Sequence, residues 1–163
     1  MALALYRRTF EAMGSPCEIQ LFAASPEDAR PIADAAIAEV GRLESRYSRY
    51  RAGSILSGIN RIAARGGEAQ LDPETASLID YADACHRESG GLFDISSGIL
   101  RRAWNFRGGA LPDPDLIAEL LSKVGWHRLR WTSPVLAFPE PGMEIDLGGV
   151  VKEYAADSVA RLC

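Results

Sequence analysis

One acid, two glycines and one lysine stand close together near the end of the 163-residue chain. Asp146 follows the apolar start of "MEIDL", Gly148 and Gly149 come next, and Lys152 lies in the first turn of a predicted helix. A buried strand that ends in a carboxylate needs hydrogen-bond donors or a cation for that charge. Glycines let a ligand approach the backbone closely, and the free amides of a helix N-terminus attract an anion. The segment therefore indicates a ligand site, and a tight strand-to-helix turn with surface charges is an equal alternative.

Three further clusters combine aromatic or polar side chains with turn residues. The stretch "GGLFDIS" places Asp94 after Leu92 and Phe93, which is typical either of turn chemistry or of an acid facing a pocket with an aromatic wall. The stretch "YSRY" ends at Tyr50 and also fits a helix C-terminus that enters a polar loop. Met13 opens "MGSP", which a plain hairpin turn explains. None of the clusters is decisive by its spacing alone.

The N-terminal part of the chain must position Met13 and Tyr50. Alternating apolar residues predict a β-hairpin over residues 3–23. A helical period then predicts one long helix through residues 25–50. Its buried stripe is expected to consist of Ile32, Ala36, Val40, Leu43 and Tyr47.

The remaining elements must position Asp94 and Asp146. Asp72 and Asp113 each precede a proline, as helix N-caps do, and the two helices are expected to end at residues 89–91 and at Gly125. Short strands are expected at "HRLRW", "VLAF" and "MEIDL". Strands at both ends with helices between them predict an α+β fold with a largely antiparallel sheet and packed helices.

The last predicted helix, which begins near Val150, has no residue that closes it. Its apolar face predicts packing partners outside this chain, and we expect a fold that is incomplete at the C-terminus. Such an unfinished hydrophobic helix also favours self-association.

Composition excludes several classes of protein. The chain is 47% hydrophobic and 25% charged with a net charge of -4, which is typical of one soluble domain and gives no support for a nucleic-acid partner. No run approaches the ~18 apolar residues of a membrane span. Cys17, Cys85 and Cys163 form no disulfide framework, and we expect the first two in the core. As written the chain is predicted to be cytoplasmic, and a leader upstream would make it periplasmic or membrane-anchored.

Taken in order, the clusters resemble the motifs of the FAD:protein FMN transferases, the ApbE-like flavin transferases. That family's pattern runs from a Met-Gly-Thr turn through Phe-Ser-x-Tyr, Ser-Glu-Ile-x-x-Leu-Asn, Gly-x-Phe-Asp-x-Thr and a Trp-containing loop to Ile-Asp-Leu-Gly-Gly-Ile-Ala-Lys-Gly-Tyr-Ala-x-Asp. The counterparts in this chain are "MGS", "YSRY", "SILSGIN", "GLFDIS", "RAWNF" and "IDLGGVVKEYAAD". The resemblance covers nearly the whole chain and keeps the family's order.

The resemblance implies an activity and a set of contacts. Such enzymes cleave FAD and attach FMN through a phosphoester to a threonine or serine of an acceptor protein, with the help of Mg²⁺. By resemblance, the FAD-binding residues would be Met13, Tyr50, Leu92, Phe93, Asp94, Asp146 and Lys152. Gly149 would offer a metal ligand, most simply its backbone carbonyl.

The resemblance also implies that the chain is about half of such an enzyme. Residues 1–163 would form the N-terminal part of a flavin transferase domain, and the C-terminal metal-ligand segment and the catalytic residues would lie outside it. We therefore expect little activity from these residues alone. The alternatives are a Mg²⁺-dependent FAD pyrophosphatase, a non-catalytic flavin-binding module and a structural protein without a ligand. The acceptor would be a protein, by analogy a subunit of a redox complex.

Overall fold

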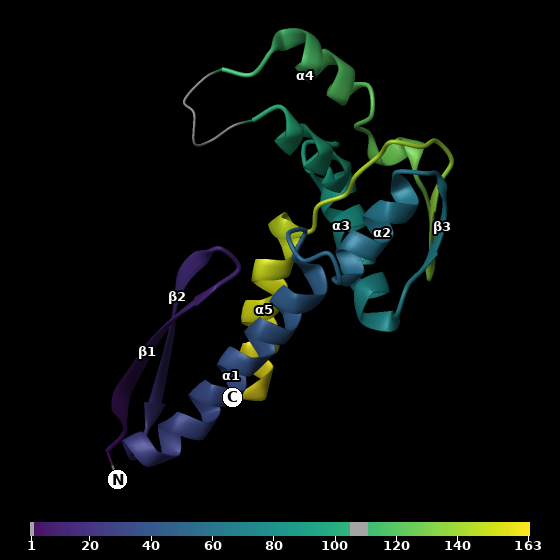
Figure 1. The fold of residues 1–163 in the computed structure, drawn as a ribbon. Helices are drawn as coiled ribbons and strands as arrows, with labels where there is room; N and C mark the ends of the chain where they lie inside the picture. The colour runs from purple at the N-terminus through teal and green to yellow at the C-terminus, as the bar shows by residue number, and fades with distance from the viewer. Residues whose placement is uncertain (1, 105–110) are drawn as a thin grey trace.

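The computed structural model describes residues 2–104 and 111–163 (Figure 1). In chain order the elements are β1 (Ala4–Ala12), β2 (Ser15–Ala23), α1 (Pro26–Tyr47), α2 (Ile55–Ala63), β3 (Gly67–Gln70), α3 (Pro73–Glu88), the 3₁₀ helix η1 (Ile95–Arg102), α4 (Pro114–Leu121), the 3₁₀ helix η2 (Trp126–Arg128), β4 (Arg130–Thr132), β5 (Val135–Phe138) and α5 (Gly148–Leu162). All the strand pairs are antiparallel. The predicted α+β class with antiparallel sheets is confirmed, with the strands divided between a hairpin and a separate three-stranded sheet.

The predicted hairpin is present and places Met13 at its tip. Ala12 pairs with Ser15, so Met13 and Gly14 form a two-residue turn. Their φ angles of 52° and 71° are the positive values that tight hairpin turns require. Both strands contact α1, which runs beside them (Figure 1).

The long helix α1 follows the prediction except near its start. Ser25 caps it by accepting from the backbone N–H of Asp28, and Pro31 lies inside it. Ala36, Val40, Leu43 and Tyr47 are buried as expected, whereas Ile32 is 36% exposed. The prediction for Ile32 is wrong because the alanine face of the helix is turned inward there. The buried residues of that turn are Ala29 and Ala33.

Two predicted helices are present, and Asp72 and Asp113 are their N-cap residues as predicted. Asp72 accepts from the backbone N–H of Thr75, and Asp113 accepts from that of Asp115. The second of them, α4, ends at Leu121 instead of near Gly125. Helix α2 and strand β3 were not expected, although Ser54 caps α2 through its side chain.

The expected strand "MEIDL" is not a strand. Ile145 is fully buried, and its backbone bonds to a side chain instead of to a neighbouring strand. Its N–H donates to Oδ1 of Asn60, and its carbonyl accepts from Nδ2 of Asn60, each at 2.9 Å. The next N–H, that of Asp146, donates to the carbonyl of Ile95 at 2.8 Å. Contacts with α2 and η1 therefore fix the segment that carries Asp146.

Helix α5 finds its packing partners within the chain, so the prediction that they lie outside it is wrong for most of the helix. It runs along α1 and also contacts α3 (Figure 1). Val151 and Ala155 are buried, and the Tyr154 hydroxyl donates to Glu74 at 3.2 Å. Its large apolar residue Leu162, near the end of the helix, is exposed.

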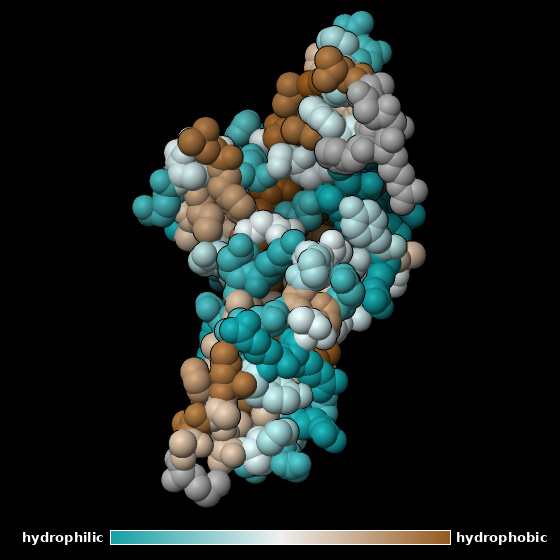
Figure 2. All heavy atoms as spheres, turned by 90° about the vertical axis from the view of Figure 1, so that its left-hand side faces the viewer, coloured by the Kyte–Doolittle hydropathy of each residue, from teal (hydrophilic) through white to brown (hydrophobic). Residues whose placement is uncertain are grey.

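One core joins the ends of α1 and α5 to α2, α3 and the three-stranded sheet. Cys17 and Cys85 are half-buried and lie outside this core, contrary to the prediction. Apolar residues on the face shown in Figure 2 gather near the upper end, where α4 lies, with hydrophilic residues over the middle. None of the described helices combines the length and the apolar character that crossing a bilayer needs.

Candidate functional site

A cleft of about 530 Å³ lies where the hairpin turn, the end of α1 and the start of α5 meet. This is the size range of small-molecule sites in proteins. Four of the residues predicted to bind a ligand line it together: Met13, Tyr50, Asp146 and Lys152. The other lining residues are Gly14, Glu44, Tyr47, Ser48, Arg49, Arg51, Gly148 and Val151.

Met13 is fixed at the mouth of the cleft by its backbone. Its N–H donates to Oε1 of Glu44 at 3.0 Å, which ties the hairpin tip to α1. A non-glycine residue with positive φ is uncommon and needs such support. Sequence reasoning did not single out Glu44, because a charged residue on a helix surface carries no local signal.

Both oxygens of the Asp146 carboxylate have partners. Oδ1 accepts from the backbone N–H of Gly148 at 2.9 Å, and Oδ2 forms an ion pair with Nη1 of Arg49. The carboxylate is partly exposed to the cleft. Burial alone would lower the pKa of the Arg49 guanidinium, but the hydrogen bond with Tyr50 and the charge of Asp146 raise it above its ordinary value. Arg49 is therefore a permanent cation in the cleft.

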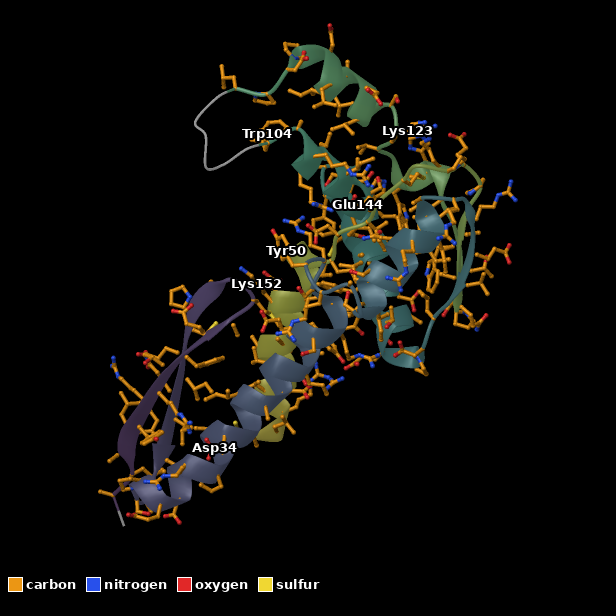
Figure 3. All side chains as sticks on the ribbon, in the orientation of Figure 1. Asp34, Tyr50, Trp104, Lys123, Glu144 and Lys152 are labelled. Atoms are coloured by element: carbon orange, nitrogen blue, oxygen red, sulfur yellow. The ribbon has the colours of Figure 1, made fainter. Side chains whose placement is uncertain are left out.

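Tyr50 presents its ring to the cleft and is 81% exposed. The guanidinium carbon of Arg49 lies 5.2 Å from the centre of the ring, a cation–π distance. In Figure 3, Tyr50 is labelled beside Lys152, which extends from the first turn of α5. An exposed aromatic ring next to two cations is a suitable surface for stacking a flat, electron-poor ring system.

The cleft carries more cations than carboxylates. Arg49, Arg51 and Lys152 face two acids, Glu44 and Asp146. Across the described part of the chain, only Arg49 of the three cations has a carboxylate within ion-pair distance. An anion in the cleft would therefore find two cations that no acid already neutralises.

Helix α5 begins at the cleft without a side-chain cap. Its N-cap residue is Leu147, whose side chain has no oxygen, and the backbone carbonyl of Leu147 accepts from the N–H groups of Val150 and Val151. Gly149 leaves room at this end of the helix, because a Cβ there would lie 2.9 Å from Cε2 of Phe93. Phe93 therefore contacts the start of α5, next to the lining residue Gly148.

The structure does not bring Leu92 or Asp94 into the cleft. Leu92 is 93% exposed. The Asp94 carboxylate caps η1 by accepting from the N–H and the hydroxyl of Ser96, and its other oxygen accepts from the N–H of Trp126 at 2.8 Å. The interpretation of "GGLFDIS" as turn chemistry thus has structural support, and a ligand contact by Asp94 stays a prediction.

Gly98 lies against Asp146, and the buried Glu144 lies two positions before it in the same segment. A Cβ on Gly98 would lie 2.8 Å from Cβ of Asp146 and 2.9 Å from its backbone nitrogen. Glu144 is 4% exposed and pairs with Arg101 at 2.6 Å and with Arg102 at 2.8 Å. Sequence reasoning missed these residues because their partners lie more than 40 positions away.

The described residues of the cleft do not provide a complete set of metal ligands. Among residues 2–104 and 111–163, no three His, Cys, Asp or Glu side chains lie close enough together to hold an ion. The Asp146 carboxylate is already bonded to Arg49 and Gly148. Gly149 could offer its carbonyl oxygen, whereas Mg²⁺ prefers about six oxygens. These residues therefore do not fit a magnesium ion without further ligands.

The elements around the cleft define an α+β protein with a ligand-sized site between a hairpin and two helices. The model of the ApbE family matches residues 13–163 of the chain. The chain therefore belongs to the ApbE family.

Relatives and solved structures agree with this assignment. The FAD:protein FMN transferase of Chlamydia pneumoniae is 32% identical over 126 residues, which cover 75% of this chain and 40% of that protein. The FAD:protein FMN transferase of Treponema pallidum is 28% identical over 174 residues, which cover 96% of this chain and 46% of that protein. The chain spans about half the length of these relatives.

The chain also covers about half of the solved structures that it matches. The ApbE protein of Thermotoga maritima superposes with a TM-score of 0.83 at 26% identity, over 98% of this chain and 52% of that one. The flavin transferase ApbE of Vibrio cholerae superposes with a TM-score of 0.85 over 98% of this chain and 53% of that one, and at 19% identity it supports the fold alone.

Proposed function

We propose that this chain carries the flavin-nucleotide site of an FAD:protein FMN transferase. The observation that supports this most is the shared cleft of Met13, Tyr50, Asp146 and Lys152, which are residues from three separate motifs. In the proposed reaction the hydroxyl oxygen of an acceptor threonine or serine bonds to the FMN phosphorus of FAD. The bond from that phosphorus to the bridging oxygen breaks, AMP leaves, and the hydroxyl proton passes to a base or to water.

Each lining residue has a role that its chemistry suits. The exposed ring of Tyr50 would stack on the flavin, and the Asp146 carboxylate would accept hydrogen bonds from it. Lys152 and the N-terminal end of α5 would face the phosphates, because a cation and the positive end of a helix dipole both stabilise negative charge. Phe93 would extend the aromatic surface from beside Gly149.

The family resemblance is the reason that the proposal includes magnesium, because the described residues alone do not form a site for it. When bound, the ion would neutralise charge on the transferring phosphoryl group. Mg²⁺ commonly keeps several waters and binds substrate phosphates, with only one or two protein carboxylates. Gly149 would be one ligand, and the others would come from outside the described residues.

The first test of the proposal is flavin binding by the chain itself. Titration with FAD, followed by flavin fluorescence, should show one saturable site. Asp146→Asn should weaken this binding about tenfold, because the carboxylate loses its negative charge as an acceptor. Glu68→Gln, which makes the same charge change on exposed β3, should leave it unchanged. No saturable binding, or equal effects of the two variants, would contradict the proposal.

The second test concerns the reaction. We expect these 163 residues to bind FAD with little turnover. The longest protein that the reading frame encodes, with FAD, Mg²⁺ and a threonine-bearing acceptor peptide, should add the mass of FMN to the peptide. Free FMN without a modified peptide would instead indicate the pyrophosphatase, in which water replaces the hydroxyl. Binding without either product would indicate a flavin-binding module.

A further inference from the structure

The Arg49 side chain forms hydrogen bonds with both Tyr50 and Asp146 in the cleft. One edge of its guanidinium pairs with Oδ2 of Asp146. Its guanidinium carbon lies over the Tyr50 ring, 5.2 Å from the ring centre, and Nη2 donates to the Tyr50 hydroxyl oxygen at 3.3 Å. Arg49 comes from the loop after α1, so it connects the "YSRY" motif with a residue 97 positions away.

Tyr50 has little other support. Its ring is largely exposed, and its backbone N–H donates to Oγ of Ser48 at 3.3 Å. A ring fixed only at its backbone rotates about two side-chain torsions. The contact with Arg49 restricts that rotation and holds the ring at the cleft.

Asp146 depends on Arg49 in a similar way. The N–H of Gly148 holds Oδ1, and Arg49 holds Oδ2. Together the two donors fix the plane of the carboxylate. Without Arg49 the carboxylate would be free to rotate away from the orientation seen in the cleft.

We propose that Arg49 is a positioning residue, which orients Tyr50 and Asp146 for the flavin ring system. This inference rests on the proposed function and assigns a role that the family motifs did not suggest. Only arginine suits the position, because its planar group can hydrogen-bond at its edge while it stacks through its face. A lysine at this position would keep the charge beside Asp146 and lose the stacked, forked geometry.

Riboflavin is uncharged and has no phosphate. Its affinity therefore reports how Tyr50 and Asp146 are positioned, without any attraction between the cations of the cleft and a phosphate. We expect Arg49→Met to lower the affinity for both riboflavin and FAD, each by about tenfold. Arg49→Lys should recover only part of that loss. The matched control is Arg51→Met, which removes the same charge from the same cleft and should lower the affinity for FAD alone.

Coupling between the residues gives a second readout that a general loss of structure would not produce. In a Tyr50→Leu background, and separately in an Asp146→Asn background, Arg49→Met should cost less than about threefold in riboflavin affinity. The circular dichroism spectrum and the thermal midpoint of each variant should match those of the parent chain. A change in quenching of flavin fluorescence should accompany Arg49→Met, because the orientation of Tyr50 against the flavin changes.

Several results would overturn the inference. A loss confined to FAD would make Arg49 a phosphate contact, and a gain in affinity would make it a competitor of the flavin for Asp146. An unchanged affinity, or equal losses in all backgrounds, would remove the positioning role while leaving the proposed function intact. Failure of the parent chain to bind either flavin would overturn the proposed function and the inference together.

Discussion

Gly98 controls how closely η1 approaches Asp146. A methyl group there would lie 2.8 Å from Cβ of Asp146 and 3.0 Å from the carbonyl carbon of Ile145. Backbone atoms fixed by Asn60 and Ile95 cannot move away easily. The position of the acid therefore depends on a glycine that lies outside every motif of the sequence.

Gly98→Ala should lower the free energy of unfolding by about 1–3 kcal/mol, since it overpacks a closely packed contact. It should also weaken flavin binding, because the segment with Asp146 must shift. Chemical denaturation and FAD titration measure the two effects. Gly41→Ala is the control, because open space surrounds Gly41 in the middle of α1. That substitution should stabilise the chain by roughly 0.5–1 kcal/mol, and a stable Gly98→Ala protein with unchanged binding would contradict the contact.

Asp94 should behave as a structural acid. Asp94→Asn keeps the size of the side chain but loses the charge that strengthens bonds to Ser96 and Trp126. The free energy of unfolding should fall by about 1–3 kcal/mol. Riboflavin affinity, measured where the variant is still folded, should stay within about twofold. A large loss of affinity in a variant of unchanged stability would instead support the predicted FAD contact.

At the scale of elements, Asn60 of α2 replaces a strand as the partner of Ile145. Its amide satisfies both backbone groups of a fully buried residue. Asn60→Leu would leave both groups without partners, at about 1–3 kcal/mol for each. We expect a loss of about 2–4 kcal/mol, measured by denaturant unfolding. Gln70→Ala on exposed β3 should change stability by less than about 0.5 kcal/mol. Equal stability of the two variants would show that the segment is held by other contacts.

The packing of α5 on α1 and α3 depends on an ion network that responds to pH. The hydrogen bond with Arg42 lowers the pKa of Glu39 from 4.5 to about 2, and Ser158 of α5 also donates to this carboxylate. Arg42 lowers the pKa of Glu74 as well. Because these folded-state values lie below the unfolded ones, the stabilisation is present above about pH 4.5 and is lost as the pH falls toward about 2.

The midpoint temperature of thermal unfolding should therefore decrease as the pH is lowered from about 5 to about 2.5. Glu39→Gln should lower the midpoint near neutral pH and make its pH dependence shallower over this window. Glu68→Gln, at an exposed position of β3 that forms no ion pair with the described residues, should keep the parent curve. A Glu39→Gln curve parallel to that of the parent chain would contradict the network.

At the scale of the whole molecule, structure that depends on residues a few positions apart was predicted from the sequence more often than structure that depends on contacts between distant residues. The hairpin and the helix after Asp72 were predicted because alternation, turn residues and caps act within a few positions. Arg49 and Asp146 lie 97 positions apart, and Asn60 and Ile145 lie 85 apart, so no local pattern indicates these contacts. The missed α2 and the wrong strand at "MEIDL" have the same cause. Four residues that the family motifs named, Met13, Tyr50, Asp146 and Lys152, line one cleft, because such motifs carry information on distant contacts that periodicity lacks.

Self-association and the cellular compartment stay predictions. Exposed apolar side chains occur on α4 and on the hairpin, where Leu5 and Phe22 form a cross-strand pair. Sedimentation of the chain with and without FAD would show whether such surfaces join two copies.

The central claim is that the cleft between the hairpin turn, α1 and α5 binds a flavin. A titration of the ¹⁵N-labelled chain with FAD, followed by amide chemical shifts, tests this most directly. The amides of Met13, Tyr50 and Gly148 should shift together along one saturable curve, while those of β3 and β5 stay in place. Shifts confined to another surface, or none at flavin concentrations that saturate fluorescence, would contradict it.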